Sequence, residues 1–479
     1  MNKTLLLFVW AAIYTGCAPD QSSNLSSTTP LCQIPASQNE KITESRSQNI
    51  FLKSEDISHY AGYKNFIVKF KENFTQGLKP TGNTITEYKV KGLMMKTLSK
   101  NSFTFALSSS INEKINVIQQ LAQDNDVEYI EPDYEIQTIT DSNVENFQAT
   151  SEIDQQGTMD QWSLTKVQAP NAWNVTSGNK DIVVAVLDSG IDYTHNDLKN
   201  NIWTNTQEVP GNGIDDDKDG YIDDVYGWNF ADNNSNPISK STSNHGTHVA
   251  GIIGGTGIGI SGVAQNVKMM ALKFIGEGGS GFTSAAIQGI DYAIKKKVFA
   301  INNSWGSSGN SKALEDAIGR AEKAGILFVV AAGNGSKGIG YNIDQTPWYP
   351  TSYENENILT VAATGTNDSM AAFSNFGKKM VDVAAPGLSI LSTLSNQSYG
   401  RLSGTSMAAP VVTGLAVLVK AANPSLTAKQ VIAVIRNSVD RVVAMTNIIG
   451  SGGRVNAFTA VRQAVHMNPT SDKLQGGCL

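Results

Sequence analysis

Cysteine is scarce in this sequence, which has three among its 479 residues: Cys17, Cys32 and Cys478. Proteins built on a disulfide framework are short and much richer in this residue. A chain of this length is instead expected to be stabilised by its hydrophobic core, so a disulfide-built scaffold is excluded. The sequence leaves open whether Cys32 and Cys478 pair with each other.

An excess of positive charge is also lacking. The formal net charge is -6, charged residues make up 17% of the chain and hydrophobic residues 40%. No basic surface is predicted that could hold the phosphates of a nucleic acid, so we expect no nucleic-acid partner. We find no internal repeat. The length is sufficient for two or three globular domains.

The first residues, "MNKTLLLFVWAAIYTGC", have the pattern of a secretory signal over residues 1–17. The apolar run is too short to span a membrane by itself. Its end, "YTGC", resembles the lipobox of bacterial lipoproteins, in which Cys17 would carry a lipid, although Tyr14 departs from that pattern. An ordinary signal peptide cleaved near Ala18 is the alternative. Both predict an extracytoplasmic protein, either secreted or membrane-anchored as a bacterial lipoprotein before processing.

Composition then divides the chain into further segments. Residues 18–57 are rich in Ser, Thr, Gln and Asn, which predicts a disordered tether. Residues 58–138 contain "NFIVKF" and "VEYIEPDYEI", typical of strands, and "INEKINVIQQLAQ", typical of an amphipathic helix, so a small α+β domain is expected. A polar stretch at residues 139–158 predicts an exposed, cleavable linker. Residues 467–479 form a polar tail.

Residues 159–466 alternate apolar strands with helices. "DIVVAVLD", "VKMMALKFI", "FAINNSW", "ILFVVAAGN", "ILTVAAT" and "VDVAAPG" are typical of buried strands, while "SAAIQGIDYAIKKK" and "SKALEDAIGRAEKAG" have helical periodicity. This pattern predicts an α/β fold with a mostly parallel sheet covered by helices on both faces. Catalytic groups in such folds gather at the carboxyl ends of the strands.

Asp188 ends the strand "DIVVAVLD", and burying its carboxylate there is costly without a partner. It could also simply cap the turn that follows. His245 and His248 lie three residues apart in "NHGTHVAGIIGG", but the Glu of a zinc motif is missing and no other histidine has ligand spacing. We therefore expect no zinc, and interpret His248 as a packed histidine beside the site.

Ser406 lies in "SGTSMAAP", at the start of an apolar helix made of small residues. The positive end of the helix dipole favours developing negative charge at such a position. A serine that only caps a core helix is the alternative.

The segments "VAVLDSGID", "HGTHVAGIIGG" and "GTSMAAPVVTG" together resemble the three signature segments of the subtilisin-like serine proteases, in the same chain order. The resemblance implies a secreted serine endopeptidase with a subtilisin-like fold. Ser406 would be the nucleophile, His245 the general base and then acid, and Asp188 the carboxylate that orients the imidazolium. The reaction would pass through an acyl-enzyme.

The same resemblance implies roles for two further segments. In "VVAAGNG", Asn334 would donate a hydrogen bond to the oxyanion, and Ala331, Ala332 and Gly333 would form one wall of the first specificity pocket. Substrate backbone would pair with the edge formed by Ser304, Trp305 and Gly306. Small wall residues predict a roomy pocket for large apolar side chains. The side chain of Trp305 could equally belong to the core.

The acidic stretch "GNGIDDDKDGYIDDVYGW" predicts structural Ca²⁺ bound by Asp215, Asp217, Asp219 and Asp223. The twelfth position of that loop is Tyr226, so it departs from the EF-hand pattern, and a solvated acidic loop remains the alternative. Another calcium site, common in the family, would use an Asp like Asp197 with a loop after the histidine motif. That loop is shortened here, so we expect this second site to be missing.

The resemblance also implies that residues 58–138 are a ferredoxin-like inhibitory propeptide, which makes the chain a self-processing zymogen that matures to a monomer. Polypeptides would be its substrates. Two rival functions remain: a catalytically silent member of the fold that serves as a binding module, and a lipase-like hydrolase. "GTSMA" does not match the G-x-S-x-G motif of the latter, because Ala408 stands in place of glycine.

Overall fold

The computed structural model describes residues 63, 65–72, 79–80, 87–90, 93–99, 103–108, 111–138, 160–239 and 243–468. The chain divides into two compact units, Met1–Asn49 and Ile50–Leu479, and the described residues all belong to the second. The expected signal peptide, tether and linker, and residues 469–479 of the expected tail, lie outside the described residues. The domain boundaries therefore remain predictions.

The first part of the described chain is a small antiparallel sheet with a helix. Its elements are β1 (Asn65–Phe70), β2 (Lys79–Pro80), β3 (Glu87–Val90), β4 (Leu93–Ser99), β5 (Thr104–Ser108), α1 (Ile111–Ala122) and β6 (Val127–Pro132). The strand order is β2-β3-β4-β5-β1-β6. Ile118 of α1 packs in one core with Phe66, Phe105 and Ile130. Residues 73–78 and 81–86 lie outside the described residues, so the complete ferredoxin-like arrangement stays a prediction.

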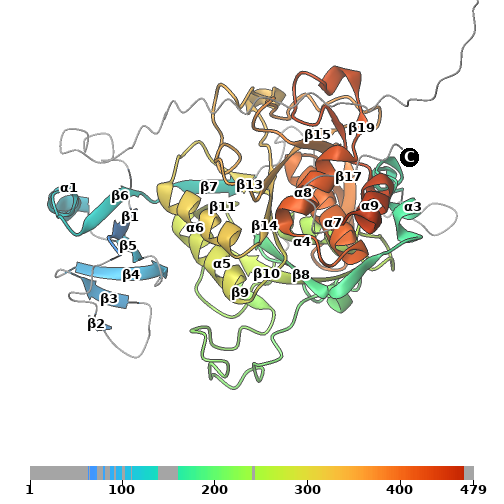
Figure 1. Cartoon of the computed structure of the whole chain (residues 1–479). Helices are drawn as coiled ribbons and strands as arrows, with labels where there is room; N and C mark the ends of the chain where they lie inside the picture. Colours follow the sequence, from blue (N-terminus) through green and yellow to red (C-terminus); the bar gives the residue numbers. More distant parts are fainter. Residues whose placement is uncertain are drawn as a thin grey trace, which may run out of the picture. The chain divides into compact units, whose positions relative to one another are not determined.

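A nine-stranded sheet is the centre of the second, larger part (Figure 1). Its order is β19-β20-β16-β15-β14-β12-β8-β10-β9, and its neighbouring strands are parallel except for the pair β19 and β20. The strands are β8 (Gly178–Asp188), β9 (Gly227–Asn229), β10 (Asn266–Lys273), β12 (Ala300–Asn303), β14 (Leu327–Ala331), β15 (Ile358–Thr364), β16 (Val383–Pro386), β19 (Asp440–Arg441) and β20 (Gly453–Arg454). The predicted mostly parallel sheet is confirmed.

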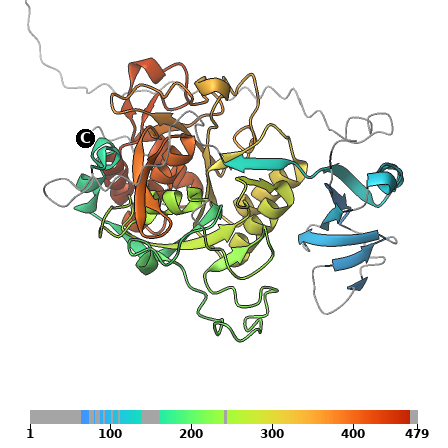
Figure 2. The ribbon, with the colours of Figure 1, turned by 180° about the vertical axis from the view of Figure 1, so that it is seen from behind.

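Helices cover both faces of this sheet, as expected. One face carries α4 (His245–Gly254), α7 (Thr405–Ala422), α8 (Ala428–Asn437) and α9 (Ala457–His466), with the short helices α2 (Trp162–Lys166) and α3 (Ala169–Trp173). The other face carries α5 (Thr283–Lys295) and α6 (Lys312–Lys323). Figures 1 and 2 show the yellow pair α5 and α6 on the opposite side of the strands from the red helices.

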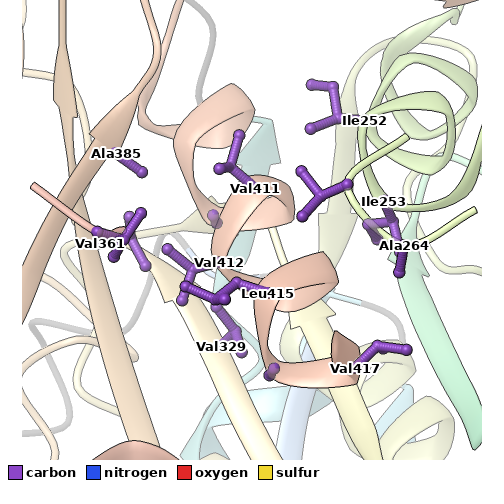
Figure 3. Close-up of a cluster of buried hydrophobic side chains, with 14 of the residues drawn as sticks. Ile252, Ile253, Ala264, Val329, Val361, Ala385, Val411, Val412, Leu415 and Val417 are labelled. Atoms are coloured by element: carbon purple, nitrogen blue, oxygen red, sulfur yellow. The ribbon is translucent and has the colours of Figure 1, made fainter. Parts of the chain in front are cut away.

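The alternation of side chains along a strand explains this sandwich, because successive residues point to opposite faces. In β8, Val184 and Val186 join the core under α4 and α7, whereas Ala185 and Leu187 join the core under α5 and α6. Figure 3 shows Val412 and Leu415 of α7 beside Val329 and Val361 of the strands.

Among the described residues, helix α7 is long and apolar enough to cross a membrane. Its residues from Thr405 to Val419 are all buried within the protein. The helix is therefore accounted for as the central core helix of the sandwich.

Smaller elements complete the described structure. They are β7 (Glu135–Thr138), β11 (Ser280–Phe282), β13 (Trp305–Gly306), the antiparallel hairpin β17 (Ile390–Leu394) and β18 (Ser398–Leu402), and the 3-10 helices η3 (Lys199–Asn201), η4 (Ser336–Gly338) and η5 (Val443–Met445). The strands β11, β7 and β13 form a sheet of their own. The strand order of the large sheet reverses at β8, whose neighbours are β10 and β12. Sites in such sheets form at the carboxyl ends of the strands beside that reversal.

Candidate active site

Asp188 is the last residue of β8 and is completely buried. One of its carboxylate oxygens, Oδ1, accepts hydrogen bonds from the backbone N–H of Ser189 at 2.7 Å and from Nδ1 of His245 at 2.7 Å. The other oxygen, Oδ2, has no hydrogen-bond partner among the described residues. Strand β8 therefore places a buried carboxylate in contact with the imidazole of His245. A residue that only capped the following turn would not need this contact.

His245 is the first residue of α4 and is 7% exposed. Because a carboxylate only accepts hydrogen bonds, the proton in the His245–Asp188 contact lies on Nδ1 when the imidazole is neutral. The lone pair is then on Nε2, which is buried and has no hydrogen-bond partner among the described residues. An imidazole in this tautomer can accept a proton at Nε2.

Glycine after the histidine is required by this close approach. A Cβ at Gly246 would collide with the carbonyl oxygen of Gly190 and lie 3.2 Å from Oδ1 of Asp188. Ser189 ties the same two segments together, because its hydroxyl accepts from the N–H of Gly246 at 3.0 Å and donates to the carbonyl of Ser243 at 3.2 Å. Sequence reasoning did not assign this role to Ser189, although its place next to Asp188 was visible.

Ser406 is the second residue of α7 and is completely buried. Its hydroxyl donates to the carbonyl oxygen of Ser304 at 2.9 Å, and the Ser304 hydroxyl donates to the carbonyl of Ser406 at 2.9 Å. This reciprocal pair joins the helix to the segment that was predicted to bind substrate backbone. Only the tertiary structure could reveal it, since the two serines are 102 positions apart.

Asn334 follows β14, and its side chain contacts the residue before Ser406. Its Oδ1 accepts from the backbone N–H of Thr405 at 3.0 Å and from the Thr405 hydroxyl at 2.9 Å. The N–H of Gly333 in turn donates to that hydroxyl at 3.1 Å. Because Oδ1 of Asn334 accepts both hydrogen bonds from Thr405, the orientation of the amide is fixed. Its Nδ2 group is the part of the side chain that can donate a hydrogen bond.

The predicted substrate-binding edge is paired with another segment of the chain. In the three-stranded sheet, Thr138 of β7 lies opposite Trp305 and Gln137 lies opposite Gly306, both antiparallel. Gln137 also pairs with Ser280 of β11 on the other side. Strand β7 thus runs between β11 and β13 (Figure 1).

The side chain of Trp305 belongs to the core, which was one of its two expected positions. It is completely buried, and its indole N–H donates to the carbonyl of Leu187 at 2.8 Å. Only the backbone of Trp305 takes part in the edge. Ala331 and Ala332 are also completely buried, and Gly333 has a φ of 95°, a conformation that favours glycine.

His248, expected to be a packed histidine, is completely buried, and its Nε2 lies 3.1 Å from the carbonyl of Gly400. Burial is the main cause that lowers the pKa of His248 to about 3, so its imidazole stays neutral.

The four predicted calcium ligands separate into different environments. Oxygens of Asp215 and Asp217 lie with one of Glu208 in a group within 4.8 Å of one another. Asp219 instead pairs with Lys296 at 3.0 Å. Asp223 accepts hydrogen bonds from the backbone of residues 211–213 at 2.8 to 3.1 Å. Glu208 was missed by sequence reasoning because it precedes the acidic stretch.

Lys296 supplies positive charge to the same region. Its Nζ lies 2.7 Å from Asp217 and 3.0 Å from both Asp219 and Asp224. Burial opposes the charge on Lys296, but the hydrogen bonds to Asp217 and Asp219 outweigh burial and raise its pKa. Lys296 thus neutralises part of the acidic region, Asp217 included. The carboxylates of Glu208, Asp215 and Asp217 also accept hydrogen bonds from backbone N–H groups at 2.8 to 3.1 Å, and they are oxygen ligands of the kind that a hard cation prefers.

Asp197, the residue of the second calcium site that the sequence predicts to be missing, accepts hydrogen bonds from the protein. Its Oδ1 accepts from the N–H of Ile258 at 2.7 Å, and its Oδ2 accepts from Gly259 at 2.9 Å, Ile260 at 3.1 Å and the Tyr399 hydroxyl at 2.7 Å. These donors fix the position of the carboxylate, and the loss of the second calcium site stays a prediction.

Residues 179–461 match the model of the subtilase family. Subtilisin-like protease 1 of Plasmodium berghei (strain Anka) is 37% identical over 336 residues, which cover 66% of this chain and 56% of that protein. The chain spans about half the length of this Plasmodium relative. An alkaline protease of Alkalihalobacillus alcalophilus is 35% identical over 347 residues, which cover 72% of this chain and 77% of that protein.

Proposed function

Because the chain belongs to the subtilase family, we propose that it is a serine endopeptidase with Ser406, His245 and Asp188 as its catalytic triad. The contact of 2.7 Å between His245 Nδ1 and Asp188, with Nε2 buried and without a partner among the described residues, is the observation that carries the proposal. A serine hydroxyl is a poor nucleophile at neutral pH unless a base removes its proton.

In the proposed reaction, Ser406 Oγ attacks the peptide carbonyl while His245 Nε2 takes the hydroxyl proton. Asp188 stabilises the imidazolium that forms. The Nδ2 of Asn334 donates to the oxyanion, which is supported by the two Thr405 donors that hold the other end of the amide. His245 then gives its proton to the leaving amine, and water hydrolyses the acyl-enzyme by the same steps in reverse.

We also propose that residues 58–138 inhibit the enzyme as its propeptide. Strand β7 pairs with β13, the edge expected to hold substrate backbone, and with β11 on its other side. The side chain of Ile136 in β7 is 1% exposed and packs in the core with Trp305. A strand held in this manner would block other polypeptides from the cleft.

Two carboxylates support this docking of the propeptide. Glu131 accepts from the Ser311 hydroxyl at 2.5 Å and from the N–H of Lys312 at 2.8 Å, at the start of α6. Asp133 accepts from the N–H of Ser284 at 2.8 Å and from its hydroxyl at 2.6 Å, at the start of α5. These oxygens accept from backbone N–H groups at helix starts, which have no partner within the helix.

The strand register narrows the position of the expected cut, for which the sequence predicts a cleavable linker at residues 139–158. Thr138 lies opposite Trp305, and the next residue along that edge is Ser304, whose carbonyl accepts from the Ser406 hydroxyl. The peptide bond between Thr138 and Ile139 is therefore the nearest candidate, and we propose the first cut there.

We further propose that the group of Glu208, Asp215 and Asp217 binds structural Ca²⁺. Three carboxylates that converge repel one another unless a cation lies between them, and Lys296 reaches only Asp217 of this group by an ion pair. The ion would stabilise the loop of residues 208–224. It has no step in the chemistry.

Cys17 lies outside the described residues, so its lipidation stays a prediction. An anchor at Cys17 would belong to the propeptide, and maturation would free the protease from the membrane. A mature enzyme that remains in the membrane pellet after complete processing would contradict this proposal.

The test of the main proposal is the intact mass of the wild-type protein and of Ser406→Ala after incubation. We expect only the wild type to lose about 140 residues from its amino end, because the serine hydroxyl makes the cut. The exposed turn residue Ser369 supplies the matched control, Ser369→Ala, which should be processed like the wild type. Equal trimming of all three proteins would assign processing to another protease. If none is trimmed and none cleaves a denatured protein, the silent binding module would be favoured.

A further inference from the structure

Two glycines on separate segments face the same side chain. A Cβ added at Gly306 would collide with the indole nitrogen of Trp348. A Cβ added at Gly333 would lie 2.9 Å from the Cδ1 and Nε1 atoms of the same indole, and also beside the amide of Asn375. The edge of the Trp348 ring therefore fills the space next to both glycines.

Gly333 stands on the segment expected to form one wall of the first specificity pocket, and Gly306 stands on the edge expected to pair with substrate backbone. Gly306 pairs with Gln137 of β7, so its backbone borders the cleft. Gly333 directly precedes Asn334, whose amide contacts Thr405 beside the nucleophile. A side chain that enters between these two segments meets the indole of Trp348. The sequence predicted a roomy pocket here, and the structure fills that room with Trp348.

Trp348 is held firmly in this position. Its backbone N–H donates to the Ser352 hydroxyl at 3.0 Å, and its carbonyl accepts from the N–H of Ser352 at 2.9 Å. The ring packs against the cluster that contains Ala332 and Ile343. Asn375 is 1% exposed and lies beside the same wall of the pocket. Its amide donates to the carbonyl of Ala332 at 3.1 Å. Moving the ring would disrupt this packing, so a large substrate side chain cannot simply displace it.

We propose that Trp348 sets an upper size limit on the residue whose carbonyl is attacked, so that this chain cleaves after small side chains such as Ala and Ser and excludes Phe and Leu. The inference rests on the proposed endopeptidase function. Trp348 acts as a specificity residue, because it limits the volume of the pocket and has no part in proton transfer.

The test compares kcat/KM of the processed protein for two peptide p-nitroanilides that differ only in their last residue, Ala or Phe. We expect the wild type to prefer Ala by about 10-fold or more, since a single methylene group in a hydrophobic pocket already changes kcat/KM by about 10-fold or more. Trp348→Gly opens the pocket and reverses the preference. Trp348→Leu leaves part of the pocket volume filled and should give an intermediate ratio of kcat/KM for the two peptides. This variant replaces Trp348→Gly in the test if the glycine variant fails to fold.

Trp162→Ala is the matched control, since Trp162 is also partly buried but donates to the carbonyl of Ser389, away from both glycines. It should keep the wild-type ratio. A wild type that prefers Phe, or a ratio unchanged in both Trp348 variants, overturns the inference while the protease function stands. A wild type that cleaves neither peptide and does not process itself overturns the proposed function, and the inference with it.

Discussion

The helices on the two faces of the large sheet begin in contrasting ways. Helix α4 begins at Asn244, whose side chain makes no capping hydrogen bond, and α7 begins at Gly404, which has no side chain. Within their first turns these helices carry His245 and Ser406. On the other face, α5 and α6 begin against the carboxylates of Asp133 and Glu131.

This difference shows how one kind of helix end can serve two purposes. A helix N-terminus offers N–H groups and a partial positive charge, which a carboxylate can occupy permanently or a reaction can use transiently. At α7 that end lies beside the proposed nucleophile and Asn334. At α5 and α6 the N–H groups of the helix start bind Asp133 and Glu131. These two residues belong to the segment that we propose is cleaved off during maturation.

The largest expected effect tests the α7 side. Asn334→Ala should lower kcat by about 100- to 1000-fold with little change in KM, because it removes the proposed oxyanion donor; this range is set by measurements on subtilisin itself. Steady-state kinetics on a peptide substrate measures the effect. The exposed Asn196 supplies a control, Asn196→Ala, which should match the wild type. An increase in KM alone would show that Asn334 serves substrate binding instead.

A smaller effect is expected on the α6 side. Glu131→Ala should weaken the hold of the cleaved propeptide about 10- to 100-fold, because it removes the acceptor of the hydrogen bonds from Ser311 and Lys312 at the start of α6. The dissociation constant of the propeptide from the processed protein measures this effect. Glu128→Ala is the matched control, since Glu128 lies on the same strand with its side chain 40% exposed. Equal constants for both variants would contradict the assigned role of Glu131.

The pH dependence sharpens the contrast between the faces. Burial, partly offset by the hydrogen bonds from Ser311 and Lys312, raises the pKa of Glu131 from 4.5 to about 7. Burial likewise raises the pKa of Asp133 from 3.8 to about 6, against the hydrogen bonds from Ser284. Docking of the propeptide therefore takes up protons. The stabilisation that protonated Glu131 and Asp133 give to the docked propeptide is fully present below about pH 4 and is lost as the pH rises through 6 and 7.

We accordingly expect the propeptide to dissociate more readily at pH 8 than at pH 5, by about 10-fold. Glu131→Gln, which cannot titrate, should show a flatter dependence than the wild type. A dissociation constant that is the same at both pH values would be inconsistent with burial of these two carboxyl groups.

The smallest expected effect concerns the acidic loop of residues 208–224. Its carboxylates differ from Glu131 and Asp133 in that they do not lie at the start of a helix. Chelation of Ca²⁺ by EDTA should lower the melting temperature of the processed protein by a few degrees, because an ion bound only to the native state stabilises it. Glu208→Gln should reduce this response, while Asp181→Asn at the exposed start of β8 should retain it. An unchanged melting curve in excess EDTA would favour the solvated loop.

Long apolar strands and periodic helices were predictable, because their burial is recorded locally in the residue pattern. The hairpin of β17 and β18 was not predicted. Its turn residues Asn396 and Gln397 have φ values of 63° and 61°, and the usual Asn-Gly signal for such a turn is missing. Lys296 and Glu208 were likewise missed in the acidic region, since neither lies within the acidic stretch itself.

The sequence by itself determined the family resemblance, the parallel sheet and the residues proposed for the triad, because each depends on a short run of neighbouring residues. Only the tertiary structure decided which distant groups meet: Ser304 with Ser406, Glu131 with the start of α6, and Trp348 with Gly306 and Gly333. The physical reason is that packing distances depend on how segments far apart in the chain are folded against one another. A glycine in the sequence records the absence of a side chain, but only the fold shows that another residue fills the space.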